Sequence, residues 1–192
     1  MAIEFELKYN ATREALSAIE KTMSGKAAVY QMQTTYYDTP ANALSSRNIT
    51  LRRRIENHIS VCTLKTPATL GRQEHELNCD TIEDAIPELC KLSDIPELPA
   101  LLEHGVVPVC GARFTRHAFT LCLQGATVEL ALDSGVLTGG EKQIPLCEVE
   151  VELKEGDPKV ATAYGLQLSI AYGLQPEKRS KFARAIALAK GE

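Results

Sequence analysis

The sequence predicts an α+β protein dominated by antiparallel strands. Roughly eight segments alternate apolar and polar residues at a period of two, which is the pattern of half-buried strands. They fall into two meander-like blocks punctuated by Gly and Pro, and each block is followed by a segment with helical periodicity. Mostly antiparallel strands of this number can close into a barrel, so we expect an eight-stranded barrel.

The first block begins with a strand over residues 1–10, where Glu4, Glu6 and Lys8 alternate with apolar residues. Thr12 is a candidate N-cap for an amphipathic helix over 12–23. Four strands are predicted next, the last two as a hairpin, at 29–38, 48–56, 59–67 and 71–79. A helical region then extends from Thr81 to His104, and we expect it to be interrupted by the prolines at 87, 96 and 99.

The second block repeats this order of strands followed by helices. Three strands are predicted at 112–124, 127–135 and 145–156. Asp157 and Pro158 begin a helix that extends to about Leu174. A last helix is predicted from Ser180 to Gly191. No linker divides the chain, so we expect a single domain over 1–192.

Composition excludes several classes of protein. An apolar content of 44% and a charged content of 24% over 192 residues are typical of a soluble globular domain. No apolar run is long enough to cross a bilayer, and the acidic N-terminus does not resemble a signal peptide, so we expect a cytoplasmic protein without a membrane partner. The net charge of −4 argues against binding to a nucleic-acid polymer. Six cysteines without a Cys-x-x-Cys pair argue against a zinc or disulfide framework.

Charged residues gather on one face of each predicted strand. Arg52 and Arg54 make a wholly basic face, whereas Glu148, Glu150 and Glu152 make an acidic one. An open sheet with these faces in water is one interpretation. Like charges on alternate residues repel, however, and few neutral polar residues separate them. We therefore favour a charged interior, in which opposite signs face one another across the barrel.

The chemistry that suits such an interior is the binding of a polyphosphate together with a divalent cation. Arginine binds phosphate oxygens through a planar fork and lysine binds them as a point charge. Mg²⁺ and Mn²⁺ prefer carboxylate and phosphate oxygens. Lys181 fits this view, because a cation in the first turn of a helix opposes the helix dipole unless an anion lies nearby. A glycosidase mechanism with paired carboxylates would leave the arginines without a role.

A Glu-x-Glu-x-Lys pattern is present as "EFELK", and further distinctive blocks follow over nearly the whole chain as "YYDT", "LRRR", "TLK", "RQEHE", "VELALDSG", "CEVEVELKEGD" and "SK". In this order they resemble the CYTH superfamily, also called the triphosphate tunnel metalloenzymes, and most of all its bacterial inorganic triphosphatases. This resemblance implies a closed eight-stranded antiparallel tunnel with helices packed outside. It also implies hydrolysis of inorganic triphosphate to pyrophosphate and phosphate, with Mg²⁺ or Mn²⁺ as cofactor.

The resemblance also implies roles for individual residues. Phosphate binding is expected of Lys8, Arg52, Arg54, Lys65, Arg72, Arg116 and Lys181. Metal binding is expected of Glu4, Glu6, Asp133, Glu148, Glu150 and Glu152, with Glu129 as a further acidic candidate. The residues expected to assist catalysis are Lys8, Lys65, Glu150 and Asp133, and the sequence leaves open which of them positions the attacking water. Glu74 and Glu76 are expected to line the tunnel, and Arg53 to face away from it.

Other functions remain open at this stage. A class IV adenylate cyclase, a thiamine triphosphatase and a non-catalytic module that binds polyphosphate or nucleotide would all use the same tunnel. A homodimer is compatible with the sequence. Family triphosphatases often carry a helical CHAD module downstream, and the sequence does not tell whether one belongs to this protein.

Overall fold

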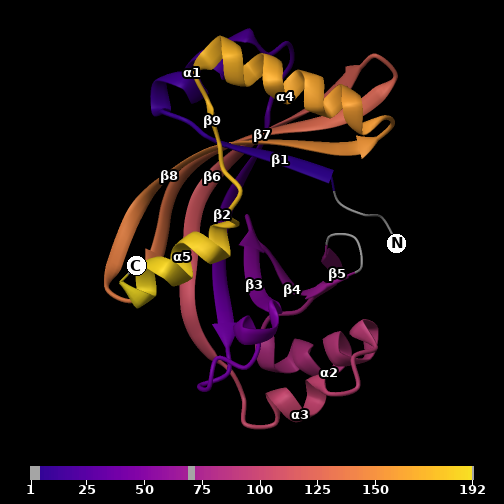
Figure 1. Ribbon diagram of the computed structural model, residues 1–192, viewed down its shortest axis with the longest axis vertical. Helices are drawn as coiled ribbons and strands as arrows, with labels where there is room; N and C mark the ends of the chain where they lie inside the picture. Colours follow the sequence, from indigo (N-terminus) through magenta and orange to yellow (C-terminus); the bar gives the residue numbers. More distant parts are fainter. Residues whose placement is uncertain (1–4, 69–71, 192) are drawn as a thin grey trace.

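A computed structural model describes residues 5–68 and 72–191, and it is an α+β structure, as predicted (Figure 1). Nine strands are present in the described residues: β1 Phe5–Asn10, β2 Ala28–Asp38, β3 Thr50–Glu56, β4 Ile59–Pro67, β5 Arg72–Asn78, β6 Val107–Leu123, β7 Ala126–Gly139, β8 Lys142–Glu155 and β9 Gln175–Pro176. The α-helices of the same residues are α1 Arg13–Thr22, α2 Ile82–Ser93, α3 Leu98–Leu102, α4 Pro158–Tyr172 and α5 Lys181–Lys190.

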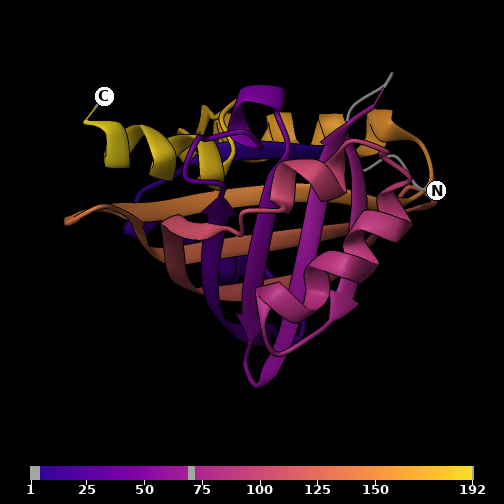
Figure 2. The same cartoon turned by 90° about the horizontal axis from the view of Figure 1, so that it is seen from below.

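All nine strands belong to one antiparallel sheet in the order β5-β4-β3-β2-β6-β7-β8-β1-β9, so pairing of β2 with β6 joins the two predicted meanders. The sheet is strongly curved (Figure 2). It is open, because no strand pairing links β5 to β1 within the described residues. The predicted closure into eight strands is therefore not confirmed. The unpredicted strand β9 pairs with Tyr9 and Asn10 and so occupies part of the edge of β1 that closure would need.

The strands of the second meander are longer than predicted. β6 begins at Val107, ahead of the predicted start at 112, and a register shift beside Tyr36 accommodates this extension. β7 continues beyond Gly135, where the predicted strand ends. A Cβ at Gly135 would lie 2.1 Å from the carbonyl oxygen of Arg113. The glycine is therefore needed for close packing inside a strand rather than for a turn.

Four helices cover the outer, convex face of the sheet. α1 and α4 cover the end formed by β1, β6, β7 and β8, where the apolar residues that alternate with the charged ones are buried (Figure 1). α2 and α3 cover the outer face at the other end, over β3 and β4. α2 continues through Pro87, so the predicted interruption there is wrong. Its buried residues Ile82, Ala85 and Leu89 anchor the helix on both sides of the proline.

The helix α5 differs from the predicted arrangement, because it packs on the inner face of the sheet (Figure 1). Phe182 and Ala185 contact inner-face residues such as Leu137 and Leu146. A Cβ at Gly139 would lie 2.4 Å from the carbonyl oxygen of Ala185, so the absence of a side chain there allows the helix to approach the sheet. This docking directs the N-terminus of α5 toward the charged face of the sheet.

Candidate functional site

A cavity of about 910 Å³ lies on the inner face of the curved sheet. Most of the residues predicted from the sequence line it: Glu6, Lys8, Arg52, Arg54, Lys65, Arg72, Glu74, Glu76, Arg116, Glu129, Glu150, Glu152 and Lys181. They come from seven strands and one helix, so the charged faces of separate strands together form a lining of both signs. Glu4 lies outside the described residues.

Asp133 and Glu148 lie beneath this lining and do not contribute to it. Both side chains are fully buried, with an exposed fraction of 0%. The register explains their neighbours, because Asp133 lies opposite both Glu148 and Arg116 on the adjacent strands. Two residues further along β8, Glu150 lies opposite Lys8 on β1. Two residues further again, Glu152 lies opposite Glu6 on β1 and Glu129 on β7.

Three cations neutralise the buried carboxylates. The ammonium of Lys181 lies 2.9 Å from Asp133 Oδ2 and 2.6 Å from Glu150 Oε1, and it also contacts Glu148. Arg116 donates two hydrogen bonds to Asp133, at 2.8 and 2.7 Å, and a further one to Glu150. Arg184 contacts the other oxygen of Glu148. The anion that stabilises Lys181 at the start of α5 is therefore the protein's own carboxylate cluster.

The pKa values reflect this arrangement. Burial alone would raise the pKa of Glu150, but Lys181 and Arg116 outweigh burial and hold it well below the usual value. Burial likewise opposes the charge of Lys181, yet the three carboxylates raise the pKa of Lys181. Burial and the neighbouring Glu150 raise the pKa of Glu148 to about 7, against the influence of Lys181 and Arg184. Glu148 therefore takes up a proton more readily than Glu150 near neutral pH.

The next carboxylates along β1 and β8, Glu6 and Glu152, face the cavity and are less neutralised by neighbouring cations. Burial and the charge of Glu150 raise the pKa of Glu6 to about 7. Lys8 lies 3.4 Å from Glu6, and Lys154 lies 2.7 Å from Glu152. Carboxylate oxygens that repel one another in this way are donors suited to Mg²⁺ or Mn²⁺. The oxygens of Asp133, Glu148 and Glu150 lie within 4.8 Å of one another, but there Lys181 already contacts all three.

The opposite wall, formed by β3, β4 and β5, is the basic one and contains three of the four arginines that line the cavity in the described residues. Arg52 lies 3.1 Å from Glu74, and Lys65 lies 2.7 Å from the same carboxylate. Arg54 contacts Glu56, and its Nε is buried without a hydrogen-bond acceptor. A buried donor without an acceptor is costly, so this atom favours an anionic ligand.

Arg72 has a different environment from the other basic residues of this wall. Its guanidinium donates to the carbonyl oxygens of Asn48 and Lys65, at 2.8 and 3.0 Å, and to the hydroxyl of Thr50 at 2.9 Å. These contacts link β5 to β3 and β4. The predicted phosphate-binding role of Arg72 stays a prediction.

The residues that alternate with the cavity-lining residues along each strand lie on the outer face of the sheet. Arg53 donates to the hydroxyl of Ser60 at 2.9 Å and does not line the cavity, as predicted.

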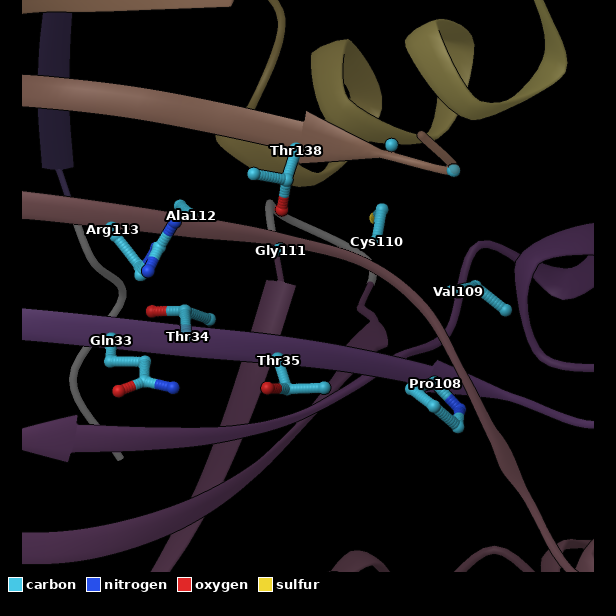
Figure 3. Close-up of a pocket in the computed structure, with 12 residues that line it drawn as sticks. Gln33, Thr34, Thr35, Pro108, Val109, Cys110, Gly111, Ala112, Arg113 and Thr138 are labelled. Carbon is cyan, nitrogen blue, oxygen red and sulfur yellow. The ribbon is translucent and has the colours of Figure 1, made fainter. Parts of the chain in front are cut away.

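A second hollow, of about 410 Å³, lies against β2 and β6 (Figure 3). Its single charged lining residue is Arg113, so its chemistry does not suit a polyphosphate.

Among the described residues, three charged residues of the site received no role from the sequence: Glu56, Lys154 and Arg184. Lys154 lines the cavity beside Glu152, and Arg184 lies beneath its floor beside Glu148. A signal for Arg184 was present, because a residue three positions after Lys181 in a helix lies on the same face. Prediction of that contact would also have required knowing that α5 docks on the inner face.

Comparison with known proteins identifies the family. A sequence model of the CYTH domain matches residues 2–186. The chain belongs to the CYTH domain family. The inorganic triphosphatase of Haemophilus influenzae is 31% identical over 126 residues, which are 64% of this chain and 36% of that protein. The match thus spans about a third of that relative's length.

Solved structures support the fold of the CYTH domain. HpAC1 of Hippeastrum, an adenylyl cyclase candidate described as having a dominant triphosphatase activity, superposes with a TM-score of 0.71 at 19% identity, covering 99% of this chain and 97% of that one. A candidate adenylate cyclase of Bacillus halodurans superposes with a TM-score of 0.61 at 17% identity, covering 95% of this chain and 96% of that one.

In the described ranges, no helix has both the length and the apolar character needed to span a membrane.

Proposed function

We propose that this CYTH domain hydrolyses inorganic triphosphate to pyrophosphate and phosphate. The observation that carries the proposal is the cavity itself, in which basic side chains of β3, β4, β6 and α5 face carboxylates of β1 and β8. The name of the Haemophilus relative and the activity ascribed to HpAC1 agree with this reaction. A volume of about 910 Å³ is ample for a small polyphosphate and falls within the range of ordinary ligand sites.

In this proposal the phosphate chain is held by Arg52, Arg54 and Lys65 on one wall and by Arg116 and Lys181 on the other. Arg54 supplies a buried donor, Nε, that has no acceptor among residues 5–68 and 72–191. Arg116 and Lys181 are already fixed by the buried carboxylates, so they lose little freedom on binding. Such preorganised cations stabilise the negative charge that develops on the transferred phosphoryl group.

We assign the divalent cation to the carboxylates that line the cavity, Glu6, Glu150 and Glu152. A bound Mg²⁺ or Mn²⁺ would neutralise phosphate charge and activate water there. Burial and Glu150 raise the pKa of Glu6 to about 7 without metal, and a bound cation would offset this by favouring the ionised carboxylate. For Asp133 and Glu148 we propose a supporting role, since both lie below the lining and contact Lys181.

A set of parallel assays tests this function. The protein is incubated with tripolyphosphate, thiamine triphosphate or ATP, each with Mg²⁺, with Mn²⁺ or with EDTA, and phosphate, pyrophosphate and cyclic AMP are measured. We expect phosphate from tripolyphosphate in the presence of metal and none with EDTA. Binding of tripolyphosphate without turnover under any condition would contradict hydrolysis and would leave a polyphosphate-binding module.

An adenylate cyclase is the second candidate function. Two of the structural relatives are described as cyclase candidates. Apolar side chains of Tyr30, Met32 and Phe114 also line the cavity, and they could contact a nucleobase. Release of cyclic AMP from ATP at a rate comparable to hydrolysis of tripolyphosphate would favour this alternative.

A further inference from the structure

A single buried carboxylate beneath the cavity connects two cations of α5. Glu148 accepts from Lys181 through Oε1 and from Arg184 through Oε2. The two cations lie three positions apart in the helix, so both reach the same side of it. Lys181 lines the cavity, whereas Arg184 does not and is only 8% exposed.

Arg184 is in turn held by residues outside α5. Its Nη1 donates to Asn10 Oδ1 at 3.3 Å, and Asn10 Nδ2 donates to Glu177 Oε2 at 3.1 Å. The backbone N–H of Glu177 donates to the carbonyl oxygen of Lys8 at 2.8 Å. A continuous set of contacts therefore extends from β1 and the segment before α5 through Arg184 to Glu148.

We propose that Arg184 is a positioning residue that fixes Glu148 and, through it, the ammonium of Lys181 at the cavity wall. The inference rests on the proposed function, because it assigns Lys181 to the binding of the phosphate chain. Without Arg184, Oε2 of Glu148 loses the cation that contacts it, and the carboxylate is free to rotate about its side-chain bonds. Lys181 then loses one of the three carboxylates that hold it in place.

The experiment measures binding of tripolyphosphate by calorimetry in metal-free buffer, at least one pH unit above 7. The variants are Arg184→Met, which removes the charge, and Arg184→Lys, which keeps it. Partners that orient metal ligands typically contribute about 10- to 100-fold in affinity or activity, and we take the lower limit for a partner of a phosphate-binding lysine. We expect Arg184→Met to weaken binding about tenfold and Arg184→Lys to restore most of that loss. Arg113→Met is the matched control, because Arg113 is exposed and does not line the cavity, and it should bind as the wild type does.

A purely structural role predicts a different result. Arg184→Met would then lower the melting temperature, while protein still folded at the assay temperature would bind tripolyphosphate with wild-type affinity; that outcome would overturn the proposal. A second comparison uses Lys181→Met. If Arg184 acts by positioning Lys181, the double variant should bind no more weakly than Lys181→Met alone, and an additional tenfold loss would refute this route.

The outcomes also separate this inference from the proposed function. A wild-type protein that neither binds nor hydrolyses tripolyphosphate overturns the function and the inference with it. A wild-type protein that hydrolyses tripolyphosphate, together with an Arg184→Met variant of unchanged affinity, overturns the inference alone.

Discussion

The two walls of the cavity contain the same types of charged residue but differ in burial. Behind the wall formed by β6, β7, β8 and α5, the side chains of Asp133 and Glu148 are 0% exposed, and that of Lys181, which lines the cavity and contacts both, is 10% exposed. On the wall formed by β3, β4 and β5, the side chains of Glu74 and Glu76 are 25% and 43% exposed. The first wall is a layered cluster with supporting groups behind it, and the second is a set of ion pairs in contact with water.

This difference indicates that the two walls have different roles in binding. Ion pairs in contact with water contribute little to stability and rearrange at low cost. Buried ion pairs are costly to break, because the remaining partner is left uncompensated in a medium of low polarity. We therefore infer that the β6–β8 wall is rigid before ligand arrives, and that the β3–β5 wall exchanges its carboxylate partners for phosphate oxygens.

The largest effect should come from breaking the buried wall. Glu148→Ala leaves Lys181 and Arg184 without a shared carboxylate, and removal of one member of a buried pair typically costs about 3–5 kcal/mol. Glu74→Ala on the other wall should cost less than about 1 kcal/mol. Denaturant unfolding of both variants above neutral pH measures the two free energies. Equal losses would show that the walls do not differ in the way described.

A smaller effect, on binding rather than stability, is expected on the basic wall. Arg54→Met removes a cavity-lining guanidinium whose Nε lacks an acceptor. Hydrogen bonds to charged groups contribute about 1.5–3 kcal/mol, so kcat/KM for tripolyphosphate should fall roughly 10- to 150-fold. Arg113→Met, on the second hollow of Figure 3, is the matched control and should leave kcat/KM unchanged. A full-activity Arg54→Met variant would remove this wall from the phosphate site.

The pH dependence of stability provides a third test, centred on Glu6. Its pKa is raised from 4.5 to about 7, so the folded protein binds more protons than the unfolded chain between these values. The contribution of Glu6 to stability therefore falls as pH rises through this window. Glu6→Gln lacks this loss, and in metal-free buffer it should gain on the order of 1–3 kcal/mol relative to wild type between acid and neutral pH. A constant difference between the two proteins across that range would contradict the raised pKa.

The smallest effect is expected on the outer face, where Arg53→Ala removes a hydrogen bond to Ser60. Substitutions that break no buried network usually change stability by about 0.5 kcal/mol. We expect kcat and KM for tripolyphosphate to stay at wild-type values. A loss of activity as large as that of Arg54→Met would mean that strand alternation does not separate the two faces of β3.

Alternation along the strands was sufficient to predict much of the site. It assigned Glu6, Lys8, Arg52, Arg54 and Glu150 to one face, and that face lines the cavity. It also assigned Arg53 to the other face. These predictions succeed because side-chain direction in a strand depends only on position parity, which is a local property.

Features that depend on contacts between distant segments could not be predicted in the same way. Strand closure was expected from the number of strands, yet β9 pairs with β1 and the sheet stays open within the described residues. Burial of Asp133 and Glu148 beneath the lining depends on α5 packing on the inner face. Alternation places these carboxylates on the correct face, but it does not tell which layer of that face they occupy.

The placement of Lys181 and Arg184 on α5 has a consequence for synthesis of the chain. Ribosomes make β8, with its buried glutamates, before they make the helix that neutralises them. When the nascent chain has emerged only as far as β9, Arg116 is available to Asp133, Glu148 and Glu150, but Lys181 and Arg184 have not yet emerged. Mutual repulsion should keep this end of the sheet loosely packed at that stage, so the inner face becomes rigid only after α5 has left the ribosome.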